Sequence, residues 1–166
     1  IRNRDVVGEE QIRKYLHGST ADFYPPWKLA GMKEGISLLQ KAAVAGEKIR
    51  VIGDYDIDGV CATYILLTGL RKIGANVDTV IPDRIKDGYG INEHLIDGAK
   101  KEGIQGIVTC DNGIAASAQI AYAKELGMKV IVTDHHEVPY EENESGRAEM
   151  LPPADVIINP KQECCN

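Results

Sequence analysis

The sequence predicts an α/β protein: a parallel-sheet, Rossmann-like domain with helices on both faces. Short apolar segments alternate with longer segments that have apolar residues at helical spacing, and glycines follow several of the latter. Strands alternating with helices of roughly 10–15 residues form βαβ units and a parallel sheet. A chain of 166 residues that is 43% hydrophobic is long enough for one domain with its own core.

The first part of the chain is expected to lead into this domain. Helices are predicted at residues 8–17 and 31–45, and a loop is predicted between them at residues 18–28. The second helix ends at Gly46, a residue type that commonly follows a helix. We therefore divide the chain into a helical and loop lead-in, residues 1–46, and the α/β domain, residues 47–166.

The alternation begins after this lead-in. Buried strands are predicted at residues 49–53, 76–81, 106–110, 129–133 and 155–158. Helices are predicted at residues 60–73, 92–102 and 115–126, the second with Asn92 as its N-cap. Residues 140–153 are rich in acidic side chains and are expected to form a loop.

Composition argues against several classes of protein. Nineteen Lys and Arg against 25 Asp and Glu leave a formal charge of −6, which argues against a module that holds nucleic acid by bulk charge. No apolar run reaches the roughly 18 residues of a membrane span, and no secretory signal is visible. The four cysteines lack zinc-finger spacing, and a cytoplasmic protein is the simplest expectation.

Three polar clusters directly follow predicted strands. They are Asp54-Tyr55-Asp56-Ile57-Asp58-Gly59, Asp111-Asn112-Gly113 and Asp134-His135-His136-Glu137. Because parallel strands end at one edge of the sheet, the clusters should converge there. Crowded carboxylates repel one another unless cations neutralise them, and mixed oxygen and imidazole ligands suit Mn²⁺, Fe²⁺ or Zn²⁺, whereas oxygen alone suits Mg²⁺. The pattern predicts a two-metal centre for phosphoester hydrolysis.

The first cluster also matches the opening of an EF-hand calcium loop, D-x-D-x-D-G. That interpretation fails because Ile65 stands at the twelfth position, where a bidentate Glu is required, and because a strand precedes the cluster. The glycine-rich patterns GxxxxGK[ST] and GxGxxG are absent from the sequence, which argues against the common nucleotide-binding loops.

These clusters belong to four motifs through which the sequence resembles the DHH phosphoesterase superfamily, and within it the RecJ-type single-strand-specific exonucleases. The motifs appear in the family's order as VIGDYDIDGV at 51–60, IPDRIKDGYGIN at 81–92, VTCDNGI at 108–114 and VTDHHEVP at 132–139. The segments NRDVV at 3–7 and DVIINPKQEC at 155–164 resemble regions that flank the motifs in the family. The resemblance therefore covers nearly the whole chain.

The resemblance implies a metal-dependent hydrolase, a 5′-to-3′ exonuclease on single-stranded DNA that releases 5′-mononucleotides in DNA repair and recombination. It implies a two-metal site for Mn²⁺ or Mg²⁺, with ligands Asp54, Asp56, Asp58, Asp111 and His135. Asp111 would bridge the metals. His136 would lie beside the scissile phosphate as a donor, and Asp134 would hold the histidines in place. Asn112 and Gly113 would have supporting roles. Arg84, Tyr89 and His136 would contact the substrate. The catalytic residues would be Arg84, Asp111 and His136.

Two departures from the family matter. Ile52 occupies a position where many members have a histidine, so Asp54 is expected to take that role. The family also has a later metal-binding aspartate and a DHHA1 domain, and neither fits after Asn166. We therefore expect a fragment that binds metal incompletely and has little or no exonuclease activity alone. Two alternatives stay open: a DHH phosphodiesterase for short oligoribonucleotides or cyclic dinucleotides, and a non-catalytic binding module. The oligomeric state cannot be predicted.

Overall fold

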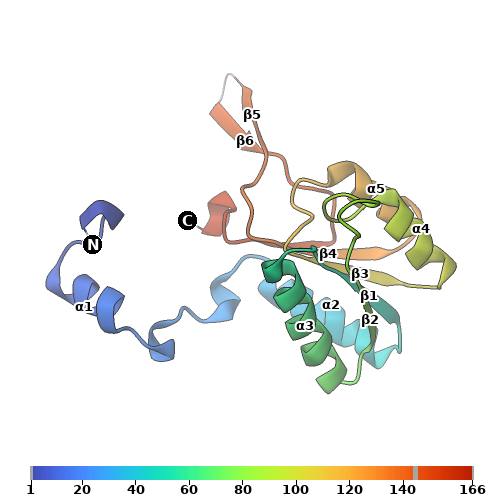
Figure 1. Ribbon diagram of the computed structural model, residues 1–166, viewed down its shortest axis with the longest axis horizontal. Coiled ribbons are helices and arrows are strands. Elements are labelled where there is room, and N and C mark those ends of the chain that lie inside the picture. Colours follow the sequence, from blue (N-terminus) through green and yellow to red (C-terminus); the bar gives the residue numbers. More distant parts are fainter. Residues whose placement is uncertain (1, 144–145, 166) are drawn as a thin grey trace.

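A five-stranded parallel sheet forms the centre of the protein, whose computed structural model describes residues 2–143 and 146–165 (Figure 1). The strand order is β2-β1-β3-β4-β7. The strands are β1 (Lys48–Ile52), β2 (Asn76–Val80), β3 (Gly106–Cys110), β4 (Lys129–Thr133) and β7 (Val156–Ile158). This confirms the predicted α/β class and parallel sheet. The order is that of the flavodoxin-like doubly wound sheets, in which the direction of winding reverses between β1 and β3.

Helices cover both faces of the sheet, as predicted. One face carries α2 (Met32–Val44) and α3 (Ile57–Lys72), and the other carries α4 (Glu93–Lys101) and α5 (Ser117–Glu125) (Figure 1). Helix α3 begins at Ile57 rather than at the expected Val60, because the Asp56 side chain accepts a hydrogen bond from the Gly59 amide and caps the helix. Among the helices of the described residues, none is both long and apolar enough to cross a membrane.

The core lies in two layers, one on each side of the sheet. Side chains alternate across the strands, so Ile107 of β3 packs with α4 and α5 while its neighbour Val108 packs with α2 and α3. Every residue of β3 is buried, because this central strand is covered on both faces. Parallel strands covered on both faces read as nearly continuous apolar runs, which explains why the strands could be located in the sequence.

The N-terminal segment extends away from the sheet (Figure 1). Its helix α1 (Glu9–His17) lies where it was predicted, and none of its residues is buried. The predicted loop that follows contains two short 3₁₀ turns, Thr20–Asp22 and Pro26–Lys28.

The acidic segment 140–153 differs from its prediction as a loop. It contains an antiparallel hairpin of β5 (Tyr140–Asn143) and β6 (Gly146–Glu149), which projects from the sheet (Figure 1). Glutamate is disfavoured in strands, which is why the sequence pattern indicated a loop. In the structure Glu142 lies opposite Arg147, and the Arg147 guanidinium lies 3.2 Å from the centre of the Tyr140 ring. Such cross-strand pairs offset the poor strand preference of glutamate.

Candidate metal centre

Three buried aspartates lie at the carboxyl edge of the sheet, each just after a strand. Asp54 follows β1, Asp111 follows β3 and Asp134 follows β4, and all three are less than a tenth exposed. Pairing of Cys110 with Thr133 sets the ends of β3 and β4 level, so the loops that follow them begin side by side. The site thus lies across the point where the winding of the sheet reverses, the usual ligand site of open α/β sheets.

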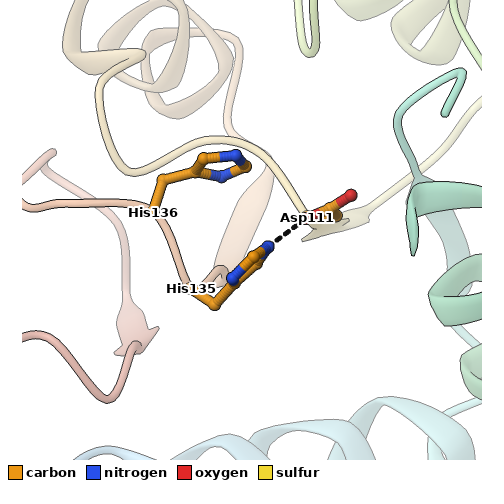
Figure 2. Close-up of side chains that lie close together, drawn as sticks. All are labelled: Asp111, His135 and His136. Atoms are coloured by element: carbon orange, nitrogen blue, oxygen red, sulfur yellow. Dashed lines mark hydrogen bonds and ion pairs between the residues drawn. The ribbon is translucent and has the colours of Figure 1, made fainter. Parts of the chain in front are cut away.

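Two groups of potential metal ligands share Asp111. One group consists of Asp111, His135 and His136, and the other of Asp54, Asp56 and Asp111. Within each group, the ligand atoms all lie within 4.8 Å of one another. Figure 2 shows the first group, with both histidines following one another on the loop after β4 and His135 directed at Asp111. A carboxylate common to two ligand groups is what a two-metal site needs.

Asp111 has an unusual backbone conformation. Its φ angle is +62°, in the left-handed region that aspartate tolerates better than most residues. Its amide donates to the Thr133 carbonyl at 3.1 Å, and its Oδ1 atom lies 2.7 Å from Nε2 of His135. Burial raises the pKa of the Asp111 carboxyl group, while the hydrogen bond to His135 opposes that change. The turn after β3 therefore holds a buried carboxylate against the loop after β4.

Asp54 has a buried carboxylate oxygen that a bound cation would satisfy. Its side chain is buried, and its Oδ1 atom has no hydrogen-bond partner among residues 2–143 and 146–165. A buried polar atom without a partner is costly, and native proteins rarely leave one unexplained. A divalent cation between Asp54, Asp56 and Asp111 would satisfy this oxygen. Together with the imidazoles of the first group, this donor set fits Mn²⁺, and the all-carboxylate group also fits Mg²⁺.

Asp134 fixes both histidines. Its Oδ1 atom accepts hydrogen bonds from the amides of His135 at 2.7 Å and His136 at 3.1 Å, and lies 2.7 Å from Nδ1 of His136. Its Oδ2 atom accepts from the Ile114 amide at 2.9 Å. The hydrogen bond to Asp134 raises the pKa of His136. Because Nδ1 of His136 is engaged in this way, Nε2 is the ring nitrogen left for a substrate.

Asn112 and Gly113 shape the turn after β3. The Asn112 amide donates to the carbonyls of Ile52 at 3.1 Å and Cys110 at 2.9 Å, and its Oδ1 accepts from the Ile91 amide at 3.1 Å. Asn112 thereby ties the ends of β1 and β3 to the loop before α4. Gly113 has φ +110°, and a Cβ atom there would lie 2.6 Å from Oγ1 of Thr109, so only glycine fits this turn.

The loop between β2 and α4 reaches the same edge through Tyr89. The Tyr89 hydroxyl donates to the Asp111 carbonyl at 3.0 Å and lies 3.4 Å from each ring nitrogen of His136. Burial and the nearby carboxylates raise the pKa of Tyr89, so its hydroxyl remains a donor at neutral pH. The Tyr55 ring meets the Tyr89 ring edge-on, with centroids 6.3 Å apart, and the exposed Arg84 guanidinium lies 5.2 Å from the Tyr55 centroid. These contacts place a cation near the metal centre.

Asp58, a predicted metal ligand, and Arg84, a predicted catalytic residue, belong to neither ligand group. Asp58 is exposed in the first turn of α3, although it borders a cleft together with Asp111 and His135. Arg84 is exposed on its loop and contacts the Tyr55 ring rather than a carboxylate of the site. The metal role of Asp58 and the phosphate role of Arg84 therefore stay predictions.

One supporting residue was not predicted. The buried Asn159, which directly follows β7, donates from its side chain to the His136 carbonyl at 3.0 Å. Its Oδ1 atom accepts from the Lys161 amide at 2.8 Å, which fixes the side chain. A polar residue just after a buried strand was the signal that identified the other three clusters, and it could have identified Asn159 too.

The fold and this edge of carboxylates and histidines define an α/β domain with two groups of potential metal ligands, and the chain belongs to the DHH family. Residues 48–166 match the model of the DHH family, N-terminal domain. The chain is similar to the single-stranded-DNA-specific exonuclease RecJ of Bacillus subtilis, with 45% identity over 156 residues, covering 94% of this chain and 19% of that protein. It is also 40% identical to RecJ of Escherichia coli over 166 residues, covering 99% of this chain and 26% of that protein.

Solved structures show the same similarity. A crystal structure of exonuclease RecJ bound to manganese aligns with a TM-score of 0.72 at 35% identity, covering 85% of this chain and 34% of that chain. RecJ of Thermus thermophilus in complex with Mn²⁺ aligns with a TM-score of 0.63 at 34% identity, covering 80% of this chain and 17% of that chain. This chain therefore spans only a minor part of the length of each of these relatives.

Proposed function

We propose that this chain is the metal-binding catalytic part of a phosphodiesterase that degrades single-stranded DNA from the 5′ end and releases 5′-mononucleotides. The observation that carries the proposal is the sharing of Asp111 between two groups of metal ligands. Paired metals joined by a carboxylate are a recurrent arrangement for hydrolysis of phosphoesters. The RecJ relatives, which are named single-stranded-DNA-specific exonucleases, support the choice of substrate. Such a substrate assigns the protein to DNA repair and recombination in the cytoplasm.

The donor set assigns a role to each residue of the centre. Asp54, Asp56 and Asp111 supply oxygen ligands, and His135 supplies a nitrogen ligand, for Mn²⁺ or Mg²⁺. These ions, when bound, polarise the phosphoryl oxygens and offset the negative charge that develops on them. His136 is oriented by Asp134 and donates a hydrogen bond from Nε2 to the phosphate. Arg84 approaches the phosphate from the loop between β2 and α4.

The chain alone is proposed to be a poor enzyme. It spans 19% of the Bacillus subtilis relative and 26% of the Escherichia coli relative. We infer that the further aspartate ligand and the DHHA1 domain of the family belong to the part of the relatives that this chain does not match. Residues 1–166 are therefore expected to bind metal incompletely and to show little or no processive digestion of DNA.

A panel of labelled substrates tests the proposed function on the full-length protein. Single-stranded DNA, a short oligoribonucleotide and a cyclic dinucleotide are incubated with Mn²⁺, and the products are separated by size. We expect 5′-mononucleotides from the DNA and none from an Asp111→Asn variant of unchanged fold. Faster hydrolysis of the ribonucleotide substrates would reassign the substrate, and hydrolysis of none of them would favour a binding module.

A further inference from the structure

A cleft of about 510 Å³ opens beside His136. It lies between the loop before α4, the turn after β3 and the start of α5. Its volume falls within the roughly 300–1,000 Å³ that is usual for small-molecule sites. The metal centre uses His136 and Asp134 from this border, and the remainder of the cleft has no role in the chemistry described above.

The walls of the cleft are mainly apolar. Ile91 and Ile114 are buried and form part of the lining, and the Tyr89 ring stands at the side near His136. Ala115 and Ala116 border the cleft at the start of α5, where their small side chains leave space. A mainly apolar lining with one aromatic ring suits a planar group that stacks on Tyr89.

Most polar side chains around the cleft already have hydrogen-bond partners within the protein. Asn112, Asp134 and Glu137 are engaged in this way, and His136 uses Nδ1 to bond to Asp134 while its Nε2 is assigned to the phosphate. Gln119, which is half-buried in α5, also borders the cleft, and none of the hydrogen bonds among the described residues involves its side chain. Its amide offers both a donor and an acceptor to a molecule in the cleft.

The charges around the cleft exclude an anion as its occupant. Neither lysine nor arginine is among the described residues that line it, and two carboxylates, Asp134 and Glu137, are. A phosphate group in the part of the cleft away from His136 would meet these carboxylates with no lysine or arginine to offset their charge. A neutral group with hydrogen-bonding edges meets no such penalty.

We propose that this cleft binds the base of the nucleotide whose phosphate lies at the metal centre, an inference that rests on the proposed function. His136 borders both the metal centre and the cleft, so a phosphate beside its ring places the attached nucleoside within reach of the cleft. The Gln119 amide can face the donor or the acceptor groups on the edge of any base. Apolar walls and one adaptable amide fit a site that holds bases without reading sequence.

The test compares two ligands that differ only in the base. Isothermal titration in Mn²⁺ measures the binding of dAMP and of 2-deoxyribose 5-phosphate to the full-length protein. Stacking of one base contributes about 1–3 kcal/mol, so dAMP should bind roughly 5- to 150-fold more tightly. Ala115→Phe, which fills the cleft, should bring dAMP down to the affinity of the sugar phosphate. Gln119→Leu should remove part of the difference, and Ala118→Phe, an exposed position of α5 outside the lining, should preserve it.

The possible outcomes distinguish failure of the base site from failure of the phosphate site at the metal centre. If both ligands bind equally to the wild type, or if Ala115→Phe leaves the preference for dAMP unchanged, the base site is wrong while the phosphate site at the metal centre stands. If neither ligand binds in Mn²⁺, the proposed phosphodiester site itself fails, and the base site fails with it.

Discussion

The Nε2 atom of His135 lies 2.7 Å from Oδ1 of Asp111, although the two residues follow different strands of the sheet. The level ends of β3 and β4 and the left-handed backbone of Asp111 bring the two side chains together. Figure 2 shows that His136 continues the same loop, so one carboxylate faces two consecutive imidazoles. On its other side, Asp111 faces Asp54 and Asp56. The functional account depends on this central position of Asp111.

Replacing Asp54 with asparagine should separate folding stability from metal binding. The variant removes a buried carboxylate whose Oδ1 has no partner in the described part of the chain. In EDTA, the free energy of unfolding should therefore be unchanged or higher by about 1 kcal/mol. In the wild type, Mn²⁺ at 100 times its dissociation constant should add about 2.7 kcal/mol, and the variant should show a smaller gain.

Urea denaturation followed by circular dichroism, with EDTA or with Mn²⁺, measures both quantities for Asp54→Asn. A variant that loses stability in EDTA but keeps the full gain from Mn²⁺ would show that Asp54 is a structural residue and not a ligand.

Replacing Asn112 with alanine should destabilise the fold strongly. The change leaves the Ile91 amide and the carbonyls of Ile52 and Cys110 without their partner in a buried turn. Unsatisfied buried groups cost about 1–3 kcal/mol each, so we expect a loss of about 3 kcal/mol in urea denaturation. Asn92→Ala is the control, because it removes the cap hydrogen bond of α4 and a longer one, at 3.3 Å, to the Asp87 carbonyl, and should cost about 1 kcal/mol. Equal losses in the two variants would count against a special role for Asn112.

The ion pair between Arg50 and Glu102 should make stability depend on pH. Arg50 of β1 is buried and donates to Glu102 at 2.7 Å and to Asp78 at 2.6 Å. The hydrogen bond from Arg50 lowers the pKa of Glu102 below its ordinary value. A carboxylate with a lowered folded-state pKa stabilises the protein above its unfolded-state pKa, and this contribution is lost as the pH falls through the folded-state value.

The comparison of wild type with Glu102→Gln tests this dependence. At pH 6 the variant should be less stable to urea than the wild type, and the difference should shrink as the pH falls below the ordinary pKa of glutamate, about 4.3. A difference that stays constant from pH 6 to pH 3 would exclude the ionised pair as its cause.

The sheet and the three polar clusters could be predicted from the sequence because the strands are buried and the clusters directly follow them. Strands covered on both faces leave continuous apolar runs, and the topology of a parallel sheet then collects whatever polar residues follow them. Asp54, Asp111 and Asp134 were identified in this way, and the structure brings their loops to one edge.

Other features depend on tertiary contacts that the local pattern does not encode. The hairpin of β5 and β6 was missed because cross-strand pairs such as Glu142 with Arg147 overcome a local preference against strands. The D-x-D-x-D spacing did not distinguish Asp56, whose carboxylate joins a ligand group, from Asp58, which the early start of α3 places in an exposed helical turn. The hydrogen bond from Asn159 to His136 joins residues that only the folded sheet brings together.

Mn²⁺ affinity of the wild type and of Asp111→Asn, measured from the electron paramagnetic resonance signal of free Mn²⁺, tests the central claim most directly. Asparagine tolerates the left-handed backbone of Asp111, so the fold should persist, as circular dichroism would verify. Glu125→Gln, an exposed substitution on α5 with the same change in charge, is the control. Loss of even an outer-shell partner weakens metal binding about 10- to 100-fold, so the loss of a shared ligand should cost at least about 100-fold. An Asp111→Asn variant that binds Mn²⁺ as tightly as the wild type and the control would contradict the account.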